Sequence, residues 1–87
     1  MPPTFEHFRS ALAEAGYRQS EAESHHAGFG SWWVIIDAVP RARVVWDGTD
    51  GWLIVQREES GDWSDAWIGK NPAEQTPERL VSVLRCL

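Results

Sequence analysis

The side chains of this 87-residue chain best suited to catalysis or metal binding are three histidines and one cysteine. His25 and His26 are adjacent, and adjacent residues rarely converge on one metal ion; even with His7 as a third ligand, no Cys, His or Asp follows them at ligand spacing. No histidine is predicted beside Cys86 to activate its thiol, so we interpret Cys86 as a packing residue. The sequence therefore predicts no catalytic residue, no metal and no cofactor.

Two aspartates beside glycines, in the DGTDG sequence of residues 47–51, are a second candidate. Asp47 and Asp50 could bind a cation, but a calcium loop needs further ligands at alternating positions and a distal Glu, and both are missing. Gly48 and Gly51 can take positive φ angles, as a bulged hairpin turn requires. We interpret this segment as a turn.

The residues around this turn have the composition of β-strands. Between Trp32 and Glu58, three runs of β-branched and aromatic residues are separated by Val-Pro-Arg and by the turn. The pattern predicts a three-stranded antiparallel meander over residues 32–39, 42–47 and 51–58. Residues 63–68 are predicted to form a short fourth strand, with a single helical turn as the alternative.

Amphipathic segments flank the predicted strands. Thr4 and Thr76 are suited to cap the starts of two helices, and Gly16 to end the first. The apolar stripes are Phe8, Ala11, Leu12 and Ala15 in the first helix and Leu80, Val83, Leu84 and Leu87 in the second. Residues 18–31 are polar and then glycine-rich, and are predicted to form a loop. We therefore expect one α+β domain, residues 1–87, in which both helices cover one face of a three- or four-stranded antiparallel sheet.

Large apolar residues at neighbouring strand positions predict that the second face of the sheet is also partly apolar. Neighbouring strand residues point to opposite faces, so Trp32 and Trp33 cannot share one. If Trp46 pairs with Trp52, then Trp52 and Ile54 lie on the helix-covered face, and Leu53 and Val55 on the other. The second, mixed face is predicted to bind a partner through Trp33, Asp37, Arg43, Val45, Arg57, Trp63, Asp65 and Trp67.

Composition and charge restrict the classes of partner that the chain is expected to bind. With 8 basic and 13 acidic residues the net charge is −5, which disfavours nucleic acids and anionic membranes. The order helix, three strands, helix resembles that of double-stranded RNA-binding domains, which carry a lysine cluster at the start of the last helix. Here that position reads NPAEQTPERL, with Lys70 alone nearby, so RNA binding is disfavoured. No apolar run approaches the roughly 20 residues of a membrane span, and no signal peptide is evident, so we expect a cytoplasmic protein.

These observations together predict a small acidic protein-binding domain, not an enzyme, that masks or neutralises a protein partner through its Trp-rich sheet face. Immunity proteins, which neutralise toxins, and secretion chaperones are similar in size and charge. The alternatives are a structural homodimer, a small enzyme, and a domain in which the 18–31 loop covers the mixed face and makes it part of the core.

Overall fold

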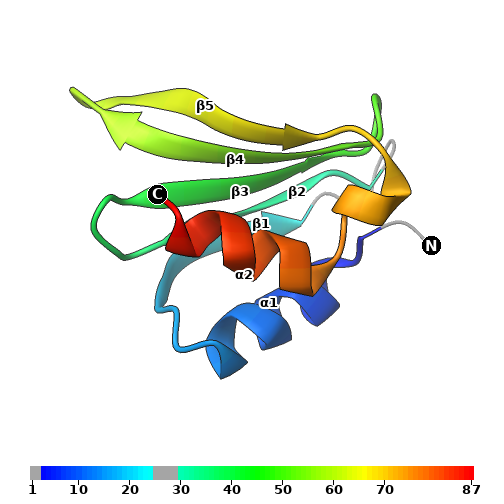
Figure 1. Cartoon of the computed structure of the whole chain (residues 1–87), viewed down its shortest axis with the longest axis horizontal. Coiled ribbons are helices and arrows are strands. Elements are labelled where there is room, and N and C mark those ends of the chain that lie inside the picture. The colour runs from blue at the N-terminus through cyan, green and yellow to red at the C-terminus, as the bar shows by residue number, and fades with distance from the viewer. Residues whose placement is uncertain (1–2, 25–29) are drawn as a thin grey trace.

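The computed structural model describes residues 3–24 and 30–87, and it shows two helices on one face of a five-stranded antiparallel sheet (Figure 1). The elements are α1 (Phe5–Glu14), β1 (Gln19–Ser24), β2 (Trp32–Ile36), β3 (Ala42–Asp47), β4 (Trp52–Glu59), β5 (Asp62–Gly69), a 3-10 helix η1 (Pro72–Glu74) and α2 (Pro77–Arg85). The strands lie side by side in chain order. The α+β class and the helix–meander–helix order are confirmed, with five strands instead of three or four.

The additional strand is β1, at one edge of the sheet. The prediction of a loop over residues 18–31 is wrong for residues 19–24, which pair with β2. Their sequence, QSEAES, contains no β-branched or aromatic residue, so local propensity does not indicate a strand. Pairing with β2 supplies the backbone hydrogen bonds, and Ala22 packs against the core. The alternative that the 18–31 segment covers the mixed face is wrong for residues 19–24, which extend the sheet at its edge. Residues 25–29, which include His25 and His26, lie outside the described residues.

The C-terminal end of α1 follows the local signals in the sequence, whereas the side chain of Thr4 at its start makes no capping hydrogen bond. Gly16 adopts a φ of 89°, which a residue with a side chain rarely takes. The backbone N–H of Tyr17 donates to the carbonyl of Leu12, and that of Gly16 to the carbonyl of Ala13. This hydrogen-bond pair is the Schellman closure of a helix. Tyr17 then packs back against the core.

The start of α2 is tied to the sheet through Gln75. Its side-chain amide donates to the carbonyls of Gly51 (2.7 Å) and Gly69 (3.0 Å), which joins the β3–β4 turn to the end of β5. The hydroxyl of Thr76 then accepts a hydrogen bond from the backbone N–H of Arg79 at 3.2 Å, as expected of a helix cap.

The core lies between the two helices and the sheet. Its buried residues are Phe8, Leu12, Trp32, Val34, Ile36, Ala42, Val44, Trp46, Leu53, Val55, Leu80 and Leu84. The Trp32 ring lies 5.6 Å from that of Phe8 and 6.0 Å from that of Phe5, measured between centroids. The apolar stripes of both helices therefore pack on the same face of the sheet.

The β3–β4 hairpin turns through four residues, 48–51. An oxygen of the Asp47 carboxylate accepts hydrogen bonds from the backbone N–H groups of Thr49 (3.0 Å) and Asp50 (3.2 Å). Gly51, with a φ of 73°, donates its N–H to the carbonyl of Asp47 at 2.7 Å. The aspartate at the start of this segment therefore stabilises the turn, as the turn interpretation requires.

This turn places β4 one residue away from the predicted register. Trp46 lies opposite Leu53 instead of Trp52. Because side chains alternate along a strand, a shift of one residue exchanges the two faces of β4. Leu53 and Val55 therefore lie in the core, whereas Trp52 and Ile54 point to the other side, so the predicted faces of β4 are wrong.

The predicted fourth strand is present as β5, and it contains a bulge. Val55 lies opposite Trp67 and Gln56 opposite Asp65, so Ala66 is an extra residue in β5. A bulge of this kind reverses the alternation beyond it. Trp67 consequently packs against the core instead of pointing away from it with Asp65.

Candidate functional site

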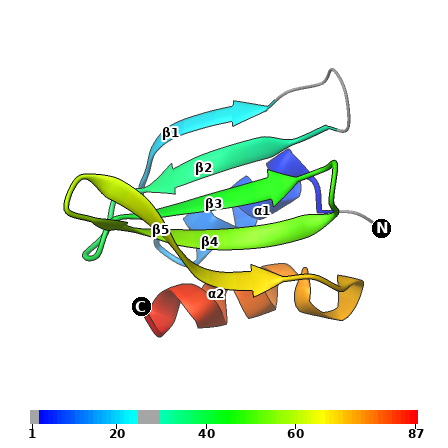
Figure 2. The same cartoon turned by 90° about the horizontal axis from the view of Figure 1, so that it is seen from above.

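The face of the sheet opposite the helices is the candidate site, and we call it the open face. Figure 2 shows the sheet from this side, with both helices behind it and the twisted strand β5 crossing in front of β3 and β4. The strand register places Glu21, Glu23, Trp33, Ile35, Arg43, Val45, Asp47, Trp52, Ile54, Gln56, Glu58, Trp63, Asp65 and Ile68 on the open face.

An apolar row runs across the middle of the open face. Trp33 lies opposite Val45, Val45 opposite Ile54, and Ile54 opposite Ile68, on four neighbouring strands. All four side chains are partly buried. They are not part of the core cluster on the helix side, so they form a separate apolar layer. Such cross-strand neighbours have side chains close enough to contact one another.

A polar row lies beside the apolar one. Nε of Arg43 donates to the side-chain carbonyl of Gln56 at 2.7 Å, and the Gln56 amide donates to the Asp65 carboxylate at 2.9 Å. Burial lowers the pKa of Arg43, and the nearby Asp65 carboxylate opposes this shift. Arg43 still carries its positive charge at neutral pH, because the ordinary pKa of an arginine is far higher. These contacts fix three side chains across β3, β4 and β5.

Cations lie over two of the open-face indoles. The guanidinium carbon of Arg43 is 4.9 Å from the Trp63 ring centroid, and that of Arg41 is 5.8 Å from it. Arg41 also forms a 2.9 Å ion pair with Glu58. The ammonium of Lys70 lies 4.7 Å from the Trp52 ring centroid. Each distance is within the roughly 6 Å over which a ring attracts a cation.

The structure brings together five of the predicted partner-binding residues on the open face: Trp33, Arg43, Val45, Trp63 and Asp65. Three others lie elsewhere. Asp37 follows the end of β2 and donates its backbone N–H to Arg18. Arg57 lies opposite the core residue Ala42, on the helix side, and is paired with Glu59. Trp67 is on the helix side because of the β5 bulge. Placing Arg57 and Trp67 on the mixed face was therefore wrong.

The sequence interpretation missed three open-face residues, Trp52, Ile54 and Ile68. The first two were assigned to the core by the incorrect β3–β4 register. A signal was present in the turn itself: an Asp followed by Gly-Thr-Asp-Gly can close a four-residue loop with its own side chain. Counting four loop residues instead of five places Trp52 opposite Asp47, as observed.

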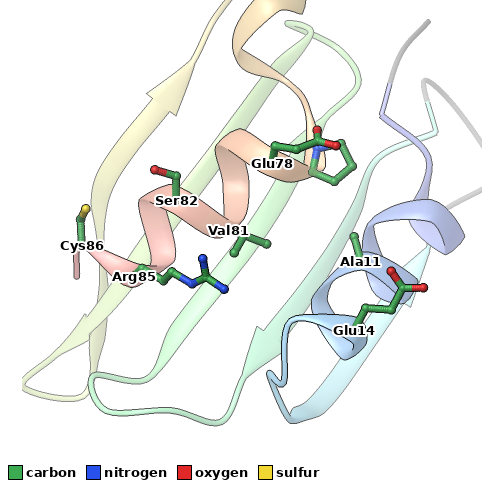
Figure 3. A pocket seen from close by; sticks show the side chains of 8 residues that line it. Ala11, Glu14, Glu78, Val81, Ser82, Arg85 and Cys86 are labelled. Atoms are coloured by element: carbon green, nitrogen blue, oxygen red, sulfur yellow. The ribbon is translucent and has the colours of Figure 1, made fainter.

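A hollow lies between the two helices, on the side of the molecule away from the open face (Figure 3). It has a volume of about 440 Å³. Val81 and Arg85 extend from α2 toward α1, from which Ala11 and Glu14 contribute to the lining. The described contacts include no hydrogen bond or ion pair among these side chains.

In residues 3–24 and 30–87, no group of His, Cys, Asp and Glu side chains could hold a metal ion.

Neither described helix has the length and apolar character of a membrane span. Compared with known protein families, with curated proteins and with solved structures, the chain matches none. The assignment of a function therefore depends on the open face.

Proposed function

We propose that this chain is a small non-enzymatic protein-binding domain that masks or neutralises a protein partner through its open face. One observation carries the proposal. The described part of this face contains three tryptophans and four aliphatic side chains, of which only Ile35 is buried, and neither α1 nor α2 covers it. An antiparallel sheet with one solvated face normally has polar residues there. A contiguous apolar patch at the surface is typical of an interaction site.

The composition of the open face supports a protein as the ligand. Tryptophan and arginine are enriched among the residues that contribute most to protein–protein affinity. The open face holds Trp33 beside Val45 in its apolar row, and Arg43 over Trp63 in its polar part. Flat indole rings offer a large contact area, and the adjacent polar groups can set the orientation of the partner.

The side chains are also held in place before binding. Gln56 connects Arg43 to Asp65 through two hydrogen bonds, and the Arg43 guanidinium lies over the Trp63 ring. A side chain that is already ordered loses less conformational entropy when a partner binds. The open face therefore combines apolar contact area with a low cost of ordering.

Affinity capture from cells of the source organism tests this proposal. Val45→Glu introduces a charge at the centre of the apolar row, and Val81→Glu makes the same change on α2, on the other side of the molecule. Both valines are partly buried. We expect the wild type and Val81→Glu to retain the same protein, and Val45→Glu to lose it, with affinity at least about tenfold weaker. Equal capture by both variants, with the folding of Val45→Glu confirmed by circular dichroism, would contradict the proposal.

A structural homodimer is the competing function, because a second copy could also bury the apolar row. Sedimentation equilibrium of the purified protein separates the two. A monomer at micromolar concentration leaves the open face available to another protein. A dimer that dissociates in Val45→Glu and persists in Val81→Glu would assign the face to self-association.

A further inference from the structure

This inference rests on the proposed function and concerns the chemistry of the partner. We infer that the open face binds a cationic protein surface, which places a Lys or Arg side chain over Trp33 near the Glu21 carboxylate of β1 and packs apolar residues on the central row.

The three open-face indoles differ in the cations that lie over them. Arg41 and Arg43 lie over Trp63, and Lys70 lies over Trp52. Among the described residues, no lysine or arginine lies over the Trp33 ring. The structure thus shows two indoles bound by cations of the same chain and one on which a partner can place its own.

The charges around Trp33 favour a cation at that position. Glu21 lies opposite Ile35, the open-face residue of β2 that follows Trp33. This glutamate is exposed at the edge of the sheet. Neither β1 nor β2 contains a basic residue. A carboxylate and the electron-rich face of an indole both attract a positive charge, and their effects add over a few ångströms.

The two arginines of the open face interact with groups of the same face. Arg41 is paired with Glu58, and Arg43 is linked through Gln56 to Asp65. Arg43 lies in the same cross-strand row as Glu21, with Ile35 between them, but its contacts with Gln56 and Trp63 direct its guanidinium toward β4 and β5. The whole chain has a net charge of −5, which also attracts a cationic partner over longer distances.

A second copy of the chain fits this charge pattern poorly. Two sheets packed face to face in the aligned arrangement keep their strands within about 30° of each other. A two-fold axis then places β1 over either β1 or β5 of the other copy. On the open face, β1 carries Glu21 and Glu23 and β5 carries Asp65, so carboxylates would face carboxylates. Like charges brought together in this way oppose association.

Panning a phage-displayed library of short random peptides against the whole protein tests the inference without a known partner. The selected peptides are synthesised, and their affinities are measured for the wild type and three variants. Glu21→Gln removes one charge from the β1 edge. Glu78→Gln removes one charge from a position on α2 that is also exposed and serves as the matched control. Val45→Glu reports whether a peptide binds the open face.

We expect the selected peptides to combine Lys or Arg with aromatic or aliphatic residues. We also expect the Val45→Glu variant to bind them no longer. Glu21→Gln should weaken them about two- to fivefold at low ionic strength, as expected for an exposed ion pair, and Glu78→Gln should not. High salt should remove the difference.

Two other outcomes separate the inference from the proposed function. In the first outcome, the peptides depend on Val45 but contain no excess of basic residues, and they bind Glu21→Gln and the wild type with equal affinity. This outcome would contradict the inference of a cationic partner but would still support the open face as a binding site. Peptides whose binding is indifferent to Val45→Glu would overturn both.

Discussion

At the scale of single residues, burial in this protein depends on the direction of a side chain more than on its type. Trp32 is 2% exposed in the core, whereas its neighbour Trp33 lies on the open face. Leu53 is completely buried between sheet and helices, whereas Ile54 is partly exposed on the other side. Alternation along a strand places chemically similar neighbours in different environments.

The pair Leu53 and Ile54 offers a test of the register. Leu53→Ala removes a side chain from a packed core and should lower the free energy of unfolding by about 2–4 kcal/mol. Ile54→Ala removes a side chain of the same volume from the open face and should cost less than half as much. Urea denaturation measures both. The reverse order of the two costs would show that the register predicted from the sequence, with Ile54 in the core, is the correct one.

At the scale of elements, a turn and a bulge decide which residues reach the open face. The four-residue turn directs Trp52 and Ile54 to it, and the extra residue Ala66 removes Trp67 from it. The indole of Trp67 folds over Gly69 on the helix side. A Cβ atom added to Gly69 would lie 2.5 Å from Cη2 of Trp67, which is closer than two non-bonded carbon atoms approach.

Substitution of Gly69 tests this packing. Gly69→Ala forces the indole of Trp67 out of its place and should destabilise the protein by about 1–3 kcal/mol, as overpacking does elsewhere. In a Trp67→Leu background the added methyl group has room, so the cost of Gly69→Ala should fall by at least about 1 kcal/mol. Chemical denaturation of the four variants of this double-mutant cycle gives the coupling. Additive costs would mean that the indole does not pack over Gly69.

At the scale of the whole molecule, the two faces of the sheet differ in what covers them. Both helices lie on one side, where the apolar side chains form the closed core. On the other side, neither helix covers the apolar residues of the open face, of which Ile35 is 6% exposed and the others are partly buried. The molecule therefore has one complete hydrophobic core and one apolar layer that a partner can complete.

The neighbours Val44 and Val45 test this asymmetry. Val44 is completely buried, so Val44→Glu places an unpaired carboxylate in the core and should prevent folding. Val45→Glu places the same charge on the open face and should leave a folded protein whose melting temperature falls by no more than about 10 °C. Thermal unfolding followed by circular dichroism distinguishes them. Unfolding of Val45→Glu would identify the open face as a second core and would contradict the proposed function.

The sequence by itself determined the helices, the central strands and the presence of apolar residues on both faces. The helix ends depend on local chemistry, such as the cap at Thr76 and the positive φ of Gly16, which can be identified from neighbouring residues. The adjacency of Trp32 and Trp33 was sufficient to predict a second apolar face. Of the candidate site, Trp33, Arg43, Val45, Trp63 and Asp65 followed from that alternation.

Only the tertiary structure decided which strands form the edges and which side chains of β4 and β5 reach the open face. β1 is a strand because β2 offers its residues hydrogen-bond partners, whereas the polar sequence of residues 19–24 has little strand propensity of its own. Trp52 and Trp67 exchanged their predicted faces because a one-residue difference in a turn, or one extra residue in a bulge, reverses all positions beyond it. Strand register is a property of two paired segments, so the composition of either segment alone does not contain it.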